Sequence, residues 1–113
     1  MKRNYKIFLK DILDSMSLIE EYVEGINFEE FQKDQKTVDA VIRNIEIIGE
    51  ATKRIPQNIK NDFLDIPWKE MSKMRDKMIH GYFTIMHEIL WETANHDIPE
   101  TKPLIEKMLE ELD

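Results

Sequence analysis

Apolar residues recur at steps of three and four positions along most of the chain, which is the spacing of one face of an α-helix. Residues 5–24 carry one such stripe, and Gly25 marks its end. The longest periodic stretch, residues 28–54, is apolar on more than one side and ends before Pro56. A helix of this kind packs against two neighbours or against a partner chain.

The start and stop signals between these stripes fit further helices. Asn27 followed by Glu30 predicts a capping box at the start of the second helix. Residues 58–64 predict one short helical turn. Pro67 suits the first position of a helix that runs over residues 68–80.

The remaining part of the chain carries two weaker signals. Residues 82–85 are β-prone, but four residues without a partner strand predict an extended connection. Residues 87–112 predict a helix that is interrupted at Pro99 and again near Pro103. The pattern as a whole predicts an all-α, up-and-down bundle of four to five helices in a single domain, residues 1–113.

Composition narrows the classes of protein that this bundle could be. The 113 residues include no cysteine, which excludes a disulfide framework and a thiolate metal site. No apolar run is long enough to span a membrane, and the basic first residues precede acidic ones rather than an apolar stretch, so we expect a cytoplasmic protein. The net charge of −7 argues against a simple electrostatic nucleic-acid binder.

The most distinctive local feature is Arg75, followed by His80 and Tyr82. Arginine binds phosphate through two parallel donors, histidine exchanges a proton near neutral pH, and tyrosine offers a hydroxyl. On one continuous helix, positions 75 and 80 lie about 140° apart, so convergence requires unwinding at Gly81 or a second copy of the chain. The structural alternative is an ordinary helix C-terminus with Gly81 as its cap.

The charge around this feature is not that of the whole chain. Between residues 68 and 80, the four cations Lys69, Lys73, Arg75 and Lys77 outnumber Glu70 and Asp76, whereas residues 100–113 are acidic. The net negative charge therefore weighs less against a local anion site on residues 68–80.

A second set of polar residues interrupts the apolar helix over residues 28–54. Buried polar groups are costly unless they are paired, and Gly49 in mid-helix indicates close approach of another element. We therefore expect either a structural ion pair with a close helix crossing, or a pairing of one carboxylate with Arg75. The set comprises Arg43, Asn44, Glu46 and Glu50.

Metal and hydrolase sites find little support in the remaining residues. The candidate ligands near the C-terminus do not share one helix face, so no metal site is expected, and the two histidines among them read as exposed. These residues are His87, Glu88, Glu92 and His96. The chain also has no glycine-rich phosphate loop.

Several motifs together resemble the HepT-like proteins of the HEPN superfamily. The short pattern Arg-x4-His-x-Tyr matches the signature of these proteins, and the similarity continues in the right order over nearly the whole chain. The motifs are Arg75-x4-His80-x-Tyr82, residues 40–51, Ile66-Pro67-Trp68, Trp91 and Asp97-Ile98-Pro99.

The resemblance implies a homodimer that acts as a metal-independent endoribonuclease toxin, with no cofactor and with RNA as substrate. Its partner would be an antitoxin of the minimal nucleotidyltransferase type. By position, Arg75 and His80 would be the catalytic pair in a cleft shared by both protomers, and Tyr82 the residue that the antitoxin modifies with AMP. Asp76 stands where the superfamily often has Asn, so a carboxylate pointing inward there would repel RNA.

The chemistry of RNA cleavage suits these residues. Without a metal, the reaction requires a base for the 2′-OH proton, an acid for the leaving 5′-oxygen and positive charge on the phosphorane. A dimer would supply two copies of His80 and of Arg75. Arg43, Asn44, Glu46, Glu50 and Asp76 would support the site. The alternatives are a non-catalytic module that binds a nucleotidyltransferase, and a helper domain that binds mononucleotides near Arg75.

Overall fold

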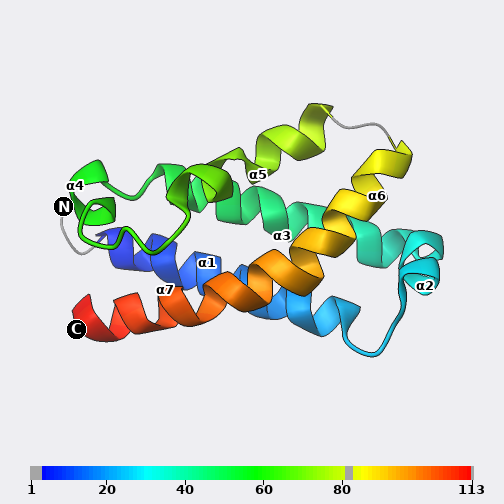
Figure 1. Cartoon of the computed structure of the whole chain (residues 1–113), viewed down its shortest axis with the longest axis horizontal. Coiled ribbons are helices and arrows are strands. Elements are labelled where there is room, and N and C mark those ends of the chain that lie inside the picture. Colours follow the sequence, from blue (N-terminus) through cyan, green and yellow to red (C-terminus); the bar gives the residue numbers. More distant parts are fainter. Residues whose placement is uncertain (1–3, 81–82, 113) are drawn as a thin grey trace.

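The computed structural model describes residues 4–80 and 83–112, and of residues 4, 75, 77–80 and 83–86 it describes the backbone alone. These residues are almost entirely helical and include no strand, which confirms the all-α fold (Figure 1). The elements are α1 (Asn4–Val23), α2 (Phe28–Lys33), α3 (Gln35–Lys53), α4 (Gln57–Lys60), α5 (Trp68–His80), α6 (Phe83–Glu92), the π-helical segment η1 (Thr93–Asp97) and α7 (Ile98–Leu112).

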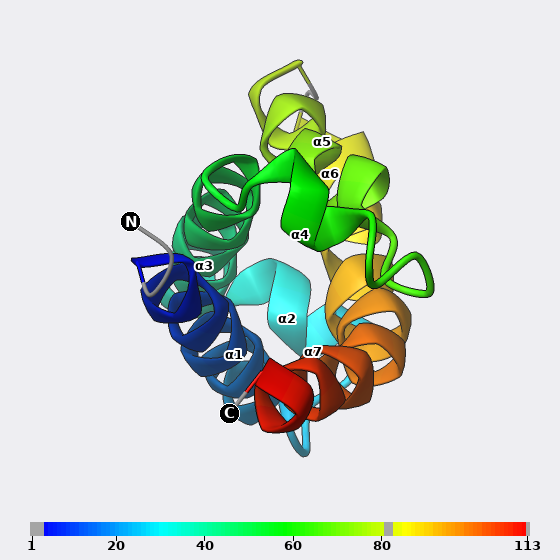
Figure 2. The same ribbon diagram turned by 90° about the vertical axis from the view of Figure 1, so that its left-hand side faces the viewer.

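Successive long helices run in opposite directions, as expected for an up-and-down bundle (Figure 1). Helix α3 has α1 on one side and α5 on the other, and α7 closes the bundle against α1 (Figure 2). The apolar faces of these helices meet in one core. Its fully buried large side chains include Leu9, Ile12, Met16, Ile19, Phe31, Ile45, Ile48, Ile55, Met71, Leu90, Ile98 and Ile105.

The turn between α1 and α2 follows the expected signals. Gly25 adopts a positive φ of 77°, a conformation that a side chain would strain, and it lies just past the end of α1. The Asn27 side chain accepts from the backbone N–H of Glu30 at 2.8 Å, and the Glu30 carboxylate accepts from that of Asn27 at 2.9 Å. The predicted capping box is therefore confirmed.

The single helix expected over residues 28–54 is wrong, because the chain breaks at Asp34. This residue ends α2 and caps α3: its carboxylate accepts from the Thr37 hydroxyl at 2.7 Å and from the Thr37 backbone N–H at 3.2 Å. The hydrogen bonds from the Thr37 hydroxyl and then its N–H hold the pKa of Asp34 below its usual value.

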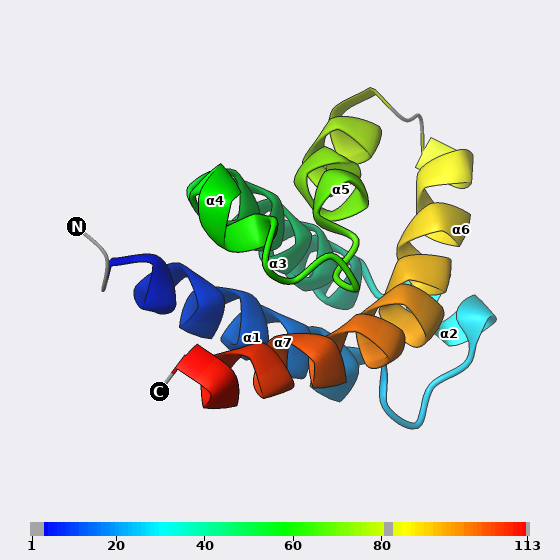
Figure 3. The same cartoon turned by 60° about the vertical axis from the view of Figure 1, so that its left-hand side comes forward.

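The C-terminal third also departs from expectation. Residues 83–85 begin α6 rather than an extended connection, and the helix is not interrupted at Pro99 or Pro103. Instead the chain passes through η1, which directly precedes Pro99. The turn of η1 is wider than an α-helical turn and accommodates the pyrrolidine ring of Pro99, which would clash with the preceding turn of an α-helix. The helix bends there and continues as α7 through Pro103 (Figure 3).

No helix within residues 4–80 and 83–112 combines the length and the apolar character that crossing a bilayer requires.

Candidate active site

Helix α5 carries the signature residues, and its N-terminal half is firmly anchored. Trp68 is buried, and its indole N–H donates to the carbonyl of Phe63 at 3.0 Å. Met71 and Met74 lie one and two turns further along and are buried as well. These contacts fix the start of α5 against the core. They therefore set where the later turns of this helix lie along the bundle axis.

Arg75 and His80 lie in the second half of α5, and the helix continues regularly to His80. The ideal positions of their Cα atoms are therefore about 140° apart around the axis. Their side chains lie outside the described residues, as does Tyr82 entirely. The proposed roles of these three residues consequently stay predictions. Asp76, which lies between Arg75 and His80 on α5, has an exposed side chain.

The first two turns of α5 present cations to solvent. Lys69 and Lys73 are exposed, as is Glu70 between them. This surface lies on the same helix as Arg75, so an anionic ligand approaching that helix would meet two ammonium groups.

Apart from Asp76, the polar residues expected to support the site lie on α3 and separate into two kinds. Asn44 is buried, and its amide donates to the Ala40 carbonyl one turn earlier at 2.8 Å. This bond satisfies its buried donor within α3, which is a structural role. Gly49 is buried on the same helix.

Arg43, Glu46 and Glu50 line one shallow groove of 420 Å³ between α1 and α3. Asp11 and Arg54 complete its charged lining, and the Arg54 guanidinium lies 5.8 Å from the centre of the Phe8 ring. The lining mixes both signs of charge, so it is not a concentrated phosphate site. The pairing of Glu46 or Glu50 with Arg75 stays a prediction, because the Arg75 side chain lies outside the described residues.

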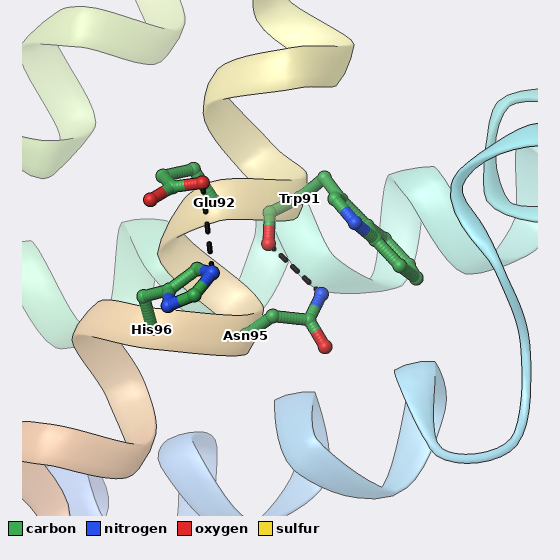
Figure 4. Close-up of polar contacts among 4 residues, drawn as sticks. All are labelled: Trp91, Glu92, Asn95 and His96. Carbon is green, nitrogen blue, oxygen red and sulfur yellow. Dashed lines mark hydrogen bonds and ion pairs between the residues drawn. The ribbon is translucent and has the colours of Figure 1, made fainter.

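The two C-terminal histidines have separate surroundings. His96 is exposed, and its Nε2 lies 3.8 Å from a carboxylate oxygen of Glu92, while the neighbouring Asn95 amide donates to the Trp91 carbonyl (Figure 4). The expectation of an exposed His87 is wrong: it is half-buried, with its ring centre 6.4 Å from that of Phe31 in an edge-on arrangement.

No group of three metal-binding side chains gathers among residues whose side chains are described. The candidate ligands near the C-terminus therefore do not form a metal centre there.

Comparison with known proteins assigns nearly the whole chain to one family. The family model described as "Ribonuclease HepT-like" matches residues 12–108. The chain is 50% identical over 108 residues to "Probable ribonuclease HepT" of Thermococcus cleftensis, covering 96% of this chain and 98% of the relative. It is 44% identical over 112 residues to "Putative RNase MJ0125" of Methanocaldococcus jannaschii, covering 99% of this chain and 97% of that relative.

A third relative, "Putative RNase TTE0752" of Caldanaerobacter subterraneus subsp. tengcongensis, is 41% identical over 103 residues, or 91% of this chain and 92% of that relative. No solved structure matches. Because both the family model and these relatives extend over nearly the full chain, the protein belongs to the HepT-like ribonuclease family.

Proposed function

We propose that this protein is a metal-independent RNA endonuclease of the toxin–antitoxin type, and that it cuts RNA at a site shared by two protomers. The observation that carries the proposal is family membership over residues 12–108, together with the presence of Arg75 and His80 on one regular helix. The relatives' names, ribonuclease and RNase, support RNA as the substrate.

The spacing on α5 is the reason for proposing a dimer. Positions 75 and 80 fall about 140° apart on the helix, so one chain offers one histidine and a displaced arginine. A two-fold axis near the end of α5 would bring two histidines and two arginines into one cleft. One His80 would then accept the 2′-OH proton, the other would protonate the leaving 5′-oxygen, and the Arg75 guanidinium groups would stabilise the phosphorane.

The reaction would be selective for RNA, because the attacking nucleophile is the 2′-OH itself. Lys69 and Lys73 would add salt-sensitive affinity for the strand without reading its sequence.

The decisive experiment measures cleavage of a fluorescent single-stranded RNA by purified protein in excess EDTA. We expect the parent to cut RNA and leave the matching DNA intact, and the His80→Ala and Arg75→Ala variants to lose at least about a hundredfold in rate. His96→Ala is the matched control, since this exposed histidine lies on η1, a different element from α5, and its Nε2 lies 3.8 Å from Glu92. Cleavage by His80→Ala at the parental rate would refute the assignment.

We further propose that an antitoxin of the minimal nucleotidyltransferase type binds the protein and transfers AMP to Tyr82. In this reaction the Tyr82 oxygen attacks the α-phosphorus of ATP, a phosphate–oxygen bond forms, pyrophosphate leaves, and the phenolic proton passes to solvent or base. The bulky anion would block the neighbouring site and repel RNA.

Intact mass after co-expression with the neighbouring nucleotidyltransferase tests this partner. A mass increase of one AMP per modification is expected, and it should disappear in Tyr82→Phe but persist in Tyr22→Phe, the control on α1. An unchanged mass in the parent would contradict the modification. A stable complex that forms although the parent never cuts RNA would instead favour the non-catalytic interaction module.

A further inference from the structure

A second hollow lies behind α5, separate from the groove between α1 and α3. This cavity of 460 Å³ lies between one face of α5 and the continuous face formed by η1 and α7. The two walls diverge in Figure 3, where α5 runs away from the junction of η1 with α7. Its size lies within the range of cavities that hold small molecules.

Three carboxylates surround this cavity. Glu70 comes from α5, Asp97 from the end of η1 and Glu100 from the first turn of α7. All three side chains are exposed, and none has an ion pair or hydrogen bond to the part of the chain that the structure describes. The described lining contributes these three carboxylates and no Lys, Arg or His.

Two buried hydroxyls open into the same cavity. Thr93 is 6% exposed and Thr101 is 5% exposed, and neither side chain has a hydrogen-bond partner among the described residues. Every fully buried side-chain nitrogen or oxygen in that part of the chain does have a partner. The small exposed areas of these two threonines must therefore include their hydroxyl oxygens, and both residues line the cavity. Polar groups in such a position are normally satisfied by a ligand or water.

The floor of the cavity is apolar. Met71 and Met74 lie beneath it and are almost completely buried. Thioether side chains of this kind adapt to flexible aliphatic groups. The described lining therefore offers three carboxylates, two threonine hydroxyls and the apolar side chains of Met71 and Met74 beneath them.

The separation of the carboxylates distinguishes between kinds of cation. No three acidic or histidine side chains with described positions converge as metal ligands, so a single divalent ion would not satisfy them together. A flexible chain with several ammonium groups would. From this geometry we propose that the cavity binds a linear aliphatic polyamine, with methylene groups over the methionines and ammonium groups on the carboxylates and on Thr93 and Thr101.

This binding does not depend on the proposed ribonuclease activity. Met74 immediately precedes Arg75 in α5, so a bound polyamine would link the helix that carries the signature to η1 and α7. Because the cavity would be filled only in the folded protein, the ligand should raise the melting temperature, and above its Kd this rise should follow the logarithm of its concentration.

The test is a titration with spermidine by calorimetry and by amide chemical shifts at physiological salt. We expect saturable binding, with shifts centred on residues 93–101 and on the first two turns of α5. The double variant Asp97→Asn/Glu100→Gln should weaken binding by at least about tenfold. The control, Glu106→Gln/Glu110→Gln, removes the same charge from exposed sites on α7 that do not line the cavity.

Equal weakening in the two double variants would overturn the proposal, since it would mean diffuse attraction to an acidic protein. Stronger binding of magnesium than of spermidine at the same site, or of a lysine-rich peptide with no response to spermidine, would also overturn it. Thr101→Val keeps the side chain's shape and should fold, as checked by circular dichroism. Undiminished spermidine affinity in this variant would refute the role of the hydroxyl.

Discussion

The indole N–H of Trp68 fixes the start of α5, and replacing this residue by Phe isolates the contribution of one hydrogen bond. The acceptor, the Phe63 carbonyl, also receives the Ile66 N–H at 3.2 Å. Losing the indole donor therefore leaves the carbonyl with one partner, and the cost is about 1 kcal/mol rather than that of an unsatisfied buried group. The smaller ring removes roughly 1 kcal/mol of packing in addition.

Trp91→Phe provides the matched comparison. Trp91 packs against Phe31, with ring centres 5.2 Å apart, and its indole N–H has no hydrogen-bond partner among the described residues. This variant should lose only the packing contribution of about 1 kcal/mol. At about 2.1 cal/mol/K per residue, the unfolding entropy of 113 residues converts 1 kcal/mol into about 4 °C.

Melting followed by circular dichroism at one protein concentration measures both variants. Trp68→Phe should melt about 8 °C below the parent and Trp91→Phe about 4 °C below it. Equal losses would refute the reasoning, because the indole hydrogen bond would then contribute nothing measurable.

Three further predictions concern the core, the junction of α2 with α3, and the exposed acid on α5. Phe31→Ala removes a fully buried ring and should lower the free energy of unfolding by about 3–5 kcal/mol in urea titrations. The pKa of Asp34 is lowered in the folded protein, so its contribution to stability is complete above the unfolded pKa of 3.8 and is lost as pH falls through the folded pKa. The difference in melting temperature between the parent and Asp34→Ala should therefore narrow below about pH 4. Asp76→Asn should tighten RNA binding about two- to threefold at low salt, measured by fluorescence anisotropy, and an unchanged affinity would place the substrate elsewhere.

Helices could be predicted from the sequence where the apolar periodicity agrees with the residues that start or end a helix. The stripe of α1 together with Gly25, and the start of α5 after Pro67, agree with the structure. The break at Asp34 was missed because an aspartate inside a periodic stretch is compatible with both a helix and a cap, and only the hydrogen bonds to Thr37 decide between them. Residues 83–85 are helical, because the β preference of so short a segment is too weak to decide its conformation.

The candidate site is local in sequence, so the helix that carries Arg75 and His80 could be predicted as well. Their proposed convergence could not, since it would depend on a second chain. The cavity between α5 and α7 could not be predicted either, because Thr93 and Thr101 line it only after the chain has passed through a π-helical turn, which no periodic pattern reveals.

The extra residue in that π-helical turn also decides which side chains in the last third of the chain face the core. Leu90 and Ile98 are both fully buried, yet eight residues of α-helix would place them about 80° apart. A π turn holds one residue more than an α turn, which reduces the offset to about 20° and returns both side chains to the core. A single-residue deletion in this segment would thus leave the helix intact but rotate the whole of α7 relative to α6 by about 100°, which would turn its buried face away from the core.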